Sequence, residues 1–496
     1  MTDHTKPAAG AGMARKSTFP IKAAIALALA ALADWLFYHQ PVGISAVIFA
    51  IALILGSLLA NFATLDRNQL PLASILAAMG LAPAVEEFNI VTLALIMLAL
   101  GMCLQLTTNR SRESLGEQAR AIGELYLIAP FRFFRDVPGM ISLSSLISGI
   151  AVWFVPLVLG GVFIFLFASA NPMIAKWIRL FITPAHAVSH INIERALLWL
   201  FILSAVWPFL HVRWRKATKA AVDLAESALQ KQDTPSHGTD FLSAATILRS
   251  LILFNLLFSV QTVLDALYLW GNTALPADIS YASYAHRGAY PLMVTALLAA
   301  GFVLIAMKPG GPTGKSRIIR PLVYLWVAQN ILLVISSILR LDLYVQIYLL
   351  TWWRVAAFIW MGLVVIGLLL IVVRIFLNRS NGWLVHANLI VLAVTLYLCA
   401  LIDLTPTIAQ YNVSHSREAS GKGVALDTNY LYQLGPQALP AVESAIALRA
   451  HDPYLVEVRA RLIERQQKDT ASWRAWGYRS WRLQRWIDAR LSSMTD

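Results

Sequence analysis

The chain has 496 residues, of which 58% are hydrophobic and only 14% carry a charged side chain. Soluble domains contain about 25% charged residues, so this composition excludes an ordinary soluble protein and predicts one that crosses a membrane several times. The formal net charge of +13 does not indicate a nucleic-acid partner, because no basic stretch forms a reader motif and membrane proteins gather cations in their cytoplasmic loops.

Two interpretations fit the first apolar segment. Arg15 and Lys16 precede an alanine- and leucine-rich run that meets Asp34, a pattern that also occurs in cleaved signal peptides. The apolar run continues beyond Asp34 through Trp35-Leu36-Phe37-Tyr38, however, and many further apolar segments follow. We therefore expect residues 1–20 to be a disordered cytoplasmic N-terminus and the first segment to be an uncleaved membrane span.

The sequence predicts an all-α integral membrane protein with about eleven transmembrane helices in a polytopic domain over residues 21–403. The predicted spans are 21–38, 43–60, 70–85, 89–107, 147–169, 191–211, 243–271, 287–307, 320–340, 349–376 and 383–403. Most are long enough to cross a hydrocarbon core of about 30 Å. The segment 70–85 is the weakest, because it is short and contains Gly80 and Pro83.

Lysine and arginine collect in alternate predicted loops. With the N-terminus inside, the inner loops contain, for example, Arg132, Arg135, Arg213 and Lys216, whereas the outer loops contain few basic residues. Cytoplasmic loops carry this excess of positive charge. The asymmetry predicts a cytoplasmic N-terminus, requires the weak third span, and places the C-terminal segment outside.

Two segments that do not span are predicted to lie at the membrane surface. Residues 112–136 mix charged and apolar side chains at helical spacing, which indicates an interfacial helix on the cytoplasmic side. Residues 171–190 indicate a similar helix on the outer face, ending near Pro184.

Residues 404–496 have a soluble composition and are predicted to form a small helical extracytoplasmic tail. Helices are expected at about 437–450 and 453–468, with Asp452-Pro453 as the start of the second. If the terminal SWRAWGYRSWRLQRW is one helix, it divides into two faces. Trp473, Trp476, Leu483 and Ile487 then lie on one side, and Arg474, Tyr478, Arg482 and Arg485 on the other. Such a helix packs on its neighbours or on the outer leaflet, or it binds an anionic lipid or polymer.

Ionisable and tyrosine side chains gather at the outer ends of the predicted spans, and we take them as a candidate polar cluster. Its members are Asp34, Asp265, Tyr284, His286, Arg287, Arg340, Asp342, Tyr344, Arg354 and Asp403. One interpretation is that they are separate interfacial anchors. The near balance of acids and bases favours the other, a paired cluster, because ionisable groups at membrane depth usually pair or line a cavity.

The sequence contains no catalytic motif set, and we expect no cofactor and no metal. Cys103 and Cys399 both lie in apolar segments, which excludes a disulfide framework. His186 and His190 are spaced as in helical zinc sites, but no carboxylate follows at metalloprotease spacing. The stretch GGPTGKS at 310–316 lacks the spacing of a phosphate-binding loop.

Several stretches in order resemble the bacterial multi-pass family catalogued as domain of unknown function 4173: DWLFYHQPVG, YASYAHRGAYPL, SSILRLDLYVQIYLLTWWR, LDTNYLYQLGPQALP and SWRAWGYRSW. The residues that match its motifs are Tyr284, Arg287, Gly288, Arg340, Leu341, Leu343, Tyr344, Leu426, Asp427, Tyr430 and Leu431. Leu349-Leu350-Thr351 stands where that family tends to have Gly-Leu-Thr, and His286 also departs from its pattern. The resemblance implies a multi-pass architecture and no particular activity.

Three classes of function remain open. We favour a non-catalytic scaffold or sensor of the bacterial inner membrane and cell envelope, whose tail, including Asp427, Tyr430, Trp473 and Trp476, contacts a protein partner or membrane lipids. The second is an enzyme acting on a lipid-linked substrate at the outer face, with Asp34, Asp265 and the Glu86-Glu87 pair as acids. The third is a transporter, ranked last because the charges lie at the span ends rather than at mid-membrane.

Overall fold

The computed structural model describes residues 19–108, 115–136, 192–214, 244–267, 298, 301–302, 316–449 and 452–495. Within these ranges the chain is helical and contains no strand. It divides into two compact units, the first formed by Met1–Asp223 with Lys468–Asp496 and the second by Leu224–Gln467. Each unit has its own hydrophobic core.

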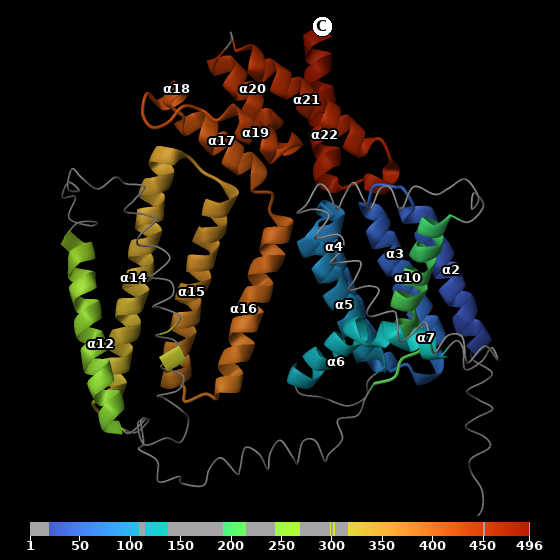
Figure 1. The fold of residues 1–496 in the computed structure, drawn as a ribbon, viewed down its shortest axis with the longest axis horizontal. Helices are drawn as coiled ribbons and strands as arrows, with labels where there is room; N and C mark the ends of the chain where they lie inside the picture. The colour runs from blue at the N-terminus through green and yellow to red at the C-terminus, as the bar shows by residue number, and fades with distance from the viewer. Residues whose placement is uncertain are drawn as a thin grey trace, which may run out of the picture. The chain divides into compact units, whose positions relative to one another are not determined.

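The first unit is a bundle of five apolar helices with further helices at its two ends (Figure 1). The long helices are α2 (Phe19–Phe37), α3 (Ile44–Ala60), α4 (Leu70–Glu86), α5 (Ile90–Thr108) and α10 (Ile193–Leu210). At one end lie α6 (Leu115–Leu127) and α7 (Arg132–Asp136). The short 3-10 helix η3 (Ala129–Phe131) connects these two, and η1 (Phe62–Thr64) and η2 (Arg67–Gln69) connect α3 to α4. At the other end lie η7 (Trp473–Ala475) and α22 (Tyr478–Thr495).

Small residues bring the helices of the first unit close together. Ala26, Ala30 and Ala33 are all fully or almost fully buried on one face of α2. On α4, a Cβ at Gly80 would overlap the Cβ of Ala99 on α5, so only glycine permits this approach. Close backbone contact through small residues is the usual way in which helices associate within a membrane.

The second unit contains a row of long helices, α12, α14, α15 and α16, with a group of shorter helices at one end (Figure 1). The row consists of α12 (Ala244–Asp265), α14 (Ile319–Tyr348), α15 (Trp352–Phe376) and α16 (Asn381–Leu401). The shorter helices are α17 (Thr405–His415), α18 (Arg417–Ser420), α19 (Thr428–Leu434), η6 (Pro436–Ala438), α20 (Leu439–Leu448) and α21 (Pro453–Thr470), whose last residues belong to the first unit.

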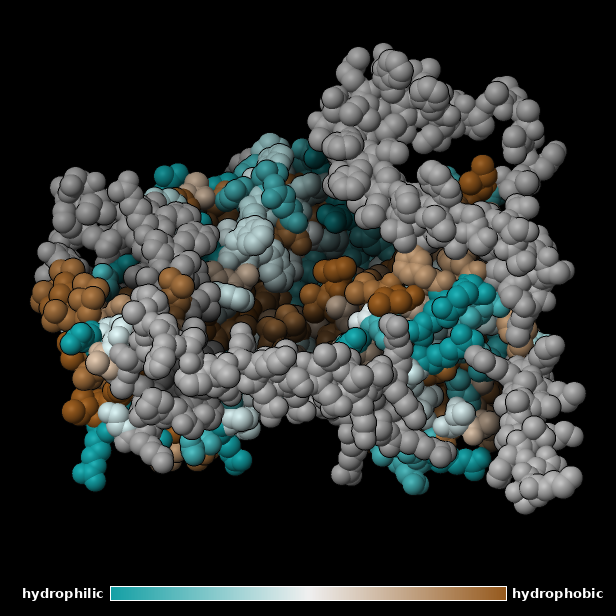
Figure 2. Space-filling model, turned by 60° about the horizontal axis from the view of Figure 1, so that its bottom comes forward, coloured by the Kyte–Doolittle hydropathy of each residue, from teal (hydrophilic) through white to brown (hydrophobic). Residues whose placement is uncertain are grey.

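Eight described helices are long and apolar enough to cross a membrane, and α3, with 17 residues, is a shorter apolar helix. Large hydrophobic side chains are exposed along these helices, and part of this apolar surface is drawn brown in Figure 2. In the 18-residue apolar stretches of α15 and α16, only 17% and 11% of the residues are buried inside the protein, as expected for helices that face lipid. The protein is therefore a multi-pass membrane protein.

Several predicted elements can be compared with the structure directly. The predicted span 147–169 and the predicted helix 171–190 lie outside the described residues. The predicted span 287–307 also lies outside them, except for Leu298, Gly301 and Phe302. The count of eleven and the orientation therefore stay predictions. The span expected at 320–340 is too short, because α14 continues for two more turns to Tyr348.

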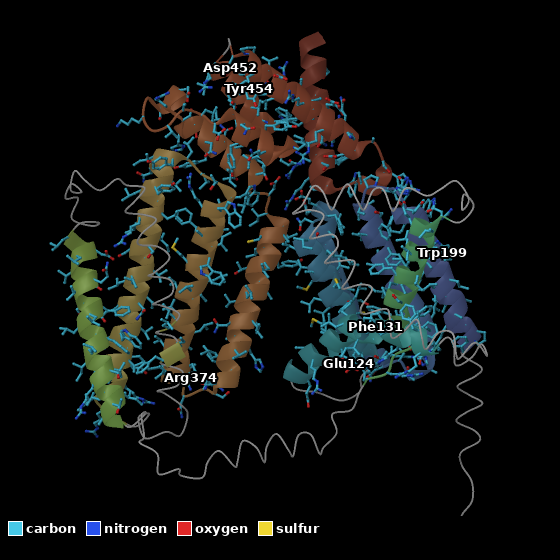
Figure 3. The ribbon with its side chains drawn as sticks, in the orientation of Figure 1. Glu124, Phe131, Trp199, Arg374, Asp452 and Tyr454 are labelled. Carbon is cyan, nitrogen blue, oxygen red and sulfur yellow. The ribbon has the colours of Figure 1, made fainter. Side chains whose placement is uncertain are left out.

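The two helices predicted in the tail are confirmed as α20 and α21. The Asp452 carboxylate accepts a hydrogen bond from the Tyr454 backbone at 3.0 Å and caps the start of α21 (Figure 3). The prediction of one helix over the terminal segment is wrong, because the backbone is not helical at Trp476 and α22 begins only at Tyr478. Leu483 and Ile487 are nevertheless buried.

Candidate functional site

The most deeply buried ion pair in the described part of the chain joins α12 and α14. A guanidinium nitrogen of Arg340 lies against Asp265 Oδ1, and the two side chains are only 6% and 3% exposed. Gln261 donates a further hydrogen bond to the same carboxylate at 3.0 Å. Two charges taken out of water are tolerable only when each compensates the other, so the pair links the end of α12 to α14, two turns before α14 ends.

The residue two positions after Arg340 does not join this pair. Asp342 is exposed and accepts a hydrogen bond from Gln346, one turn further along α14, at 2.8 Å. Residues two apart on a helix point in nearly opposite directions. Arg340 and Asp342 therefore act separately, one toward α12 and the other toward the helix surface.

The next turn of α14 forms an aromatic and cationic end to the helix. The tilted rings of Tyr344 and Tyr348 pack with their centroids 4.7 Å apart, and the Arg354 guanidinium lies 4.6 Å from the centroid of the Tyr344 ring. Arg354 also donates to the carbonyl oxygen of Tyr348 at 2.6 Å and to that of Leu349. It thereby satisfies carbonyl groups that a helix end leaves without partners.

The turn between α14 and α15 has a backbone conformation that favours glycine. Leu349 has φ of 65° and ψ of −178°, a combination that costs a side-chain-bearing residue free energy. Leu349 stands at one of the positions where the sequence departs from the Gly-Leu-Thr pattern. Its side chain is 5% exposed, so burial offsets part of that cost.

Two residues of the tail hold this turn in place. The Asn412 side chain accepts a hydrogen bond from the Leu350 backbone at 2.7 Å and donates one to the Leu350 carbonyl at 2.9 Å. The hydroxyl oxygen of Tyr430 accepts from the Trp352 backbone at 2.9 Å. Burial raises the pKa of the Tyr430 phenol, so it stays protonated at neutral pH and its own proton remains available for donation.

The two other predicted acids of this unit cap helices. Asp427 accepts from the Tyr430 backbone at 2.9 Å at the start of α19, and Asp403 accepts from the Thr405 backbone at 3.0 Å before α17. A carboxylate at a helix start satisfies a free backbone N–H and interacts favourably with the helix dipole. Their roles are thus local.

In the first unit, Asp34 is held by an arginine of a distant span. Arg195 on α10 donates from Nε to both carboxylate oxygens, at 2.9 and 3.1 Å, and from a terminal nitrogen at 2.5 Å. The Arg195 guanidinium also lies over the Tyr38 ring, 5.5 Å from its centroid. The planar fork of arginine is suited to such a two-pronged contact with a carboxylate.

The terminal tryptophans lie beside the start of α3. Trp35 and Trp473 pack with centroids 5.5 Å apart, and Arg474 lies 4.8 Å over the Trp35 ring. The Ile44 backbone donates to the Trp476 carbonyl at 2.9 Å. A Cβ at Gly43 would collide with the backbone of Ala475, so this glycine permits the contact.

A further tail residue engages the acids that end α4. Arg479, whose side chain is 7% exposed, donates to Glu87 at 2.7 Å and lies 4.0 Å from Glu86. The chain at Gly477 runs against the Glu86 carbonyl, where a Cβ would be 3.1 Å from the oxygen. These contacts explain why the terminal segment bends at this point instead of continuing as one helix.

Part of the predicted cluster falls outside the described residues, namely Tyr284, His286 and Arg287 with Gly288, and so does the His186–His190 pair. Within the described ranges no group of three or more His, Cys, Asp or Glu side chains could hold a metal ion. Among the remaining members the structure pairs Asp265 with Arg340 and joins Tyr344 with Arg354. It places Asp34 with Arg195 in the other unit.

Sequence reasoning missed three residues that organise these sites: Arg195, Asn412 and Arg479. Arg195 is a charged residue in the first turn of an apolar span, which is a usable signal of a partner. Arg479 lies among other arginines of the tail, and Asn412 is an ordinary amide in a polar helix. For these two no pattern in the sequence indicates the partner.

Residues 22–445 match the family described as domain of unknown function (DUF4153), and the chain belongs to that family. The resemblance to domain of unknown function 4173 therefore named the wrong family, although both readings give a multi-pass protein of unknown function. Tyrosines, tryptophans and arginines recur at span ends in general, so short motifs there distinguish poorly between such families. No curated protein matches the chain, and no solved structure does.

Proposed function

We propose that this protein is a non-catalytic scaffold or sensor of the bacterial inner membrane, whose tail is fixed to the ends of the spans and presents a surface to an envelope partner. The observation that carries this proposal is the two-way hydrogen bonding between Asn412 of the tail and the Leu350 backbone. A flexible tether would not need a buried side chain that replaces backbone pairing at the turn between two spans.

The same kind of attachment occurs in the first unit, by different chemistry. There a backbone hydrogen bond from Ile44 to Trp476 and the Arg479–Glu87 ion pair hold the terminal segment against the ends of α3 and α4. The spans and the tail are thus coupled in both units. A movement of the span ends would be transmitted to the tail, as a sensor requires, and a rigid tail also suits a scaffold.

The alternative of an enzyme acting on a lipid-linked substrate is less well supported by the same geometry. Each acid proposed for it already has an arginine partner: Asp34 has Arg195, Asp265 has Arg340, and the Glu86-Glu87 pair has Arg479. General acid–base catalysis needs a carboxyl group within hydrogen-bond reach of the substrate. In this arrangement the contacts of these carboxylates are with arginines of the protein itself.

A transporter is favoured by one specific observation. Near the middle of α12 and α14, Asn255, Gln329 and Asn330 are buried, and within the described part of the chain the amide oxygen of each accepts no hydrogen bond. Polar groups at mid-membrane are expected along a substrate path. Their amide nitrogens, however, donate to the backbone or to Ser259, which also suits simple helix association.

The coupling proposal is tested by loosening the tail without removing it. Asn412→Ala leaves the Leu350 N–H and C=O without their side-chain partner, which costs about 1–3 kcal/mol at a buried site. We expect faster cleavage of the tail by added protease and, in cells, an envelope defect equal to that of a strain with residues 405–496 deleted. Ser414→Ala, on the same helix but bonded only to its own α17, is the matched control and should behave as wild type.

Two outcomes would contradict the proposal. If the deletion strain shows no change in detergent sensitivity or dye permeability, the tail has no envelope role. If Asn412→Ala loosens the tail and the envelope stays normal while the deletion is defective, fixation to the spans is unnecessary. The transporter is tested separately: a metabolite that stabilises the wild type against heat, but not Gln329→Leu, would favour it.

A further inference from the structure

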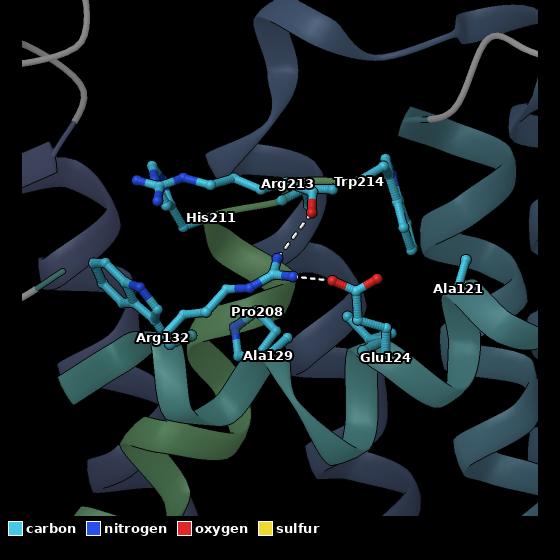
Figure 4. Close-up of a pocket in the computed structure, with 11 residues that line it drawn as sticks. Ala121, Glu124, Ala129, Arg132, Pro208, His211, Arg213 and Trp214 are labelled. Atoms are coloured by element: carbon cyan, nitrogen blue, oxygen red, sulfur yellow. Dashed lines mark hydrogen bonds and ion pairs between the residues drawn. The ribbon is translucent and has the colours of Figure 1, made fainter. Parts of the chain in front are cut away.

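A hollow of about 410 Å³ opens in the first unit at the end of the bundle where α5 and α10 finish. Its lining consists of Glu124, Ile128, Phe131, Arg132, Arg135, Arg213 and Trp214. It adjoins a narrower cavity between α6 and the end of α10, shown in Figure 4. None of these residues belongs to the polar cluster or to the tail contacts described above.

The floor of the hollow is built from fixed charges. In Figure 4 the Arg132 guanidinium reaches between two acceptors, the Arg213 carbonyl at 2.8 Å and the Glu124 carboxylate. The Arg213 side chain is held in turn by Asp136 at 3.1 Å. Asp136 also accepts from the Trp207 indole at 3.3 Å. These contacts preorganise two of the arginines and balance their charges.

Among the described residues, Arg135 is the lining arginine that this network holds least tightly. Its side chain is 71% exposed, and its ion pair with Asp136, at 3.9 Å, is to a carboxylate that already contacts Arg213. Three arginines, including Arg135, line the hollow together with one carboxylate, that of Glu124. A largely exposed guanidinium beside a preorganised arginine is an arrangement suited to binding phosphate oxygens in pairs.

The surroundings of the hollow are those of a membrane–water boundary. The Trp214 indole donates to Thr108 Oγ1, at the last residue of α5, at 2.9 Å, so two spans end here. On the adjoining α6 segment, Leu127 is 73% and Ile128 53% exposed. Large exposed apolar side chains next to arginines are typical of a helix lying in the interface, with its apolar face among acyl chains.

We propose that this hollow binds the phosphate group of an anionic phospholipid, with Arg135 as the main electrostatic contact and Ile128 and Phe131 beside the acyl chains. Basic pockets between span ends bind acidic lipid headgroups in other membrane proteins. The combination of cationic floor and apolar rim favours a lipid over a soluble phosphate compound, because a soluble ligand gains nothing from the rim. This site is independent of the scaffold or sensor role.

The proposal is tested on the purified full-length protein by native mass spectrometry during titration with phosphatidylglycerol, with phosphatidylcholine and with inorganic phosphate. We expect retained phosphatidylglycerol in excess of phosphatidylcholine, and a loss of about fivefold in Arg135→Gln, the factor that one interfacial cation contributes. Arg120→Gln removes the same charge from an exposed position of α6 that does not line the hollow. It should retain the lipid as the wild type does.

Three results would overturn the proposal. Equal retention of both lipids would show that the site does not recognise an anionic headgroup. An equal loss in Arg120→Gln would show diffuse attraction instead of a site. Displacement of phosphatidylglycerol by an equal concentration of inorganic phosphate would assign the hollow to soluble phosphate. Since Arg135 is exposed, its replacement does not endanger folding, so a changed lipid count reports on binding.

Discussion

Each unit contains an arginine–aspartate pair that joins two long apolar helices, Arg340–Asp265 in the second unit and Arg195–Asp34 in the first, and these two pairs differ in their access to water. In the second unit, Arg340 and Asp265 are 6% and 3% exposed. In the first unit, Asp34 is similarly buried at 8%, but the Arg195 side chain is 55% exposed. The same two chemical groups are therefore placed in a dry helix interface in one case and at a wet boundary in the other.

This difference shows that ion pairing alone does not define a role. Removing one partner of a buried pair leaves an uncompensated charge without water, which is strongly destabilising, whereas a pair that reaches solvent can replace its partner with water. Loss of one partner of the Arg340–Asp265 pair should consequently weaken the packing of α12 on α14. The Arg195–Asp34 pair orients side chains, including Tyr38 below the guanidinium.

The largest effect is expected for Arg340→Leu. Among the described residues it leaves the buried Asp265 with Gln261 as its remaining hydrogen-bond donor, and breaking a buried pair in this way costs about 3–5 kcal/mol of stability. We expect a marked fall in the thermal unfolding temperature of the purified protein in detergent. The measurement is the unfolding midpoint, followed by intrinsic tryptophan fluorescence.

The double variant Arg340→Leu with Asp265→Leu provides the control, because it removes both charges together. Replacement of a whole buried pair by apolar residues is often neutral or stabilising, so most of the lost stability should return. Asp342→Asn, two residues further along α14 and exposed, should leave the midpoint unchanged. A double variant as unstable as the single one would show that the helices do not depend on charge compensation.

These two pairs also show how far the sequence could lead. The apolar segments predicted the described spans to within a few residues at most ends, because length and hydrophobicity are local properties. The gathering of Asp265 and Arg340 at neighbouring span ends could be suspected for the same reason. The partner of Asp34 could not be chosen, since Arg195 lies 161 positions away and depends on which spans pack together.

The tail shows a second limit of sequence reasoning. The helices α20 and α21 were predictable, because Asp452-Pro453 marks a helix start wherever it occurs. The bend at Trp476–Gly477 was not, because it arises from contact with Gly43 and Glu86, more than 380 positions earlier in the chain. A periodicity of Trp and Arg that suits one helix was overridden by tertiary packing.

A smaller effect is expected for Arg195→Ala. The Asp34 carboxylate should recover part of its hydration through the space that the arginine vacates, so the unfolding midpoint should fall less than in Arg340→Leu. The salt concentration distinguishes the two variants, because dissolved ions screen exposed ion pairs and hardly affect buried ones. Raising the salt concentration should therefore reduce the difference between wild type and Arg195→Ala and leave the effect of Arg340→Leu unchanged. Equal salt dependence in both would remove the distinction between the pairs.

The smallest effect concerns Glu418 in the tail, a partly buried counterpart of the two aspartates. Burial raises the pKa of this carboxyl, but hydrogen bonds from Arg449 and from the Leu426 backbone outweigh burial, and the net pKa lies below the usual value of 4.5. Because the folded pKa is lower than the unfolded one, the ionised pair stabilises the tail above the unfolded pKa. That contribution is lost as the pH falls through the folded pKa.

Protease resistance of the tail should accordingly decline on acidification below about pH 4.5, the usual pKa of a glutamate. Glu418→Gln removes the titrating group and should make the tail less resistant at neutral pH, with a flatter dependence on acid. Glu464→Gln, on the exposed face of α21, removes a carboxylate of the same type and should keep the wild-type profile. If Glu418→Gln keeps the wild-type dependence of protease resistance on acid, another group causes that dependence. The Arg449 contact would then have no role in the stability of the tail, unlike the Arg340 contact, where we expect compensation of a buried charge to be needed for stability.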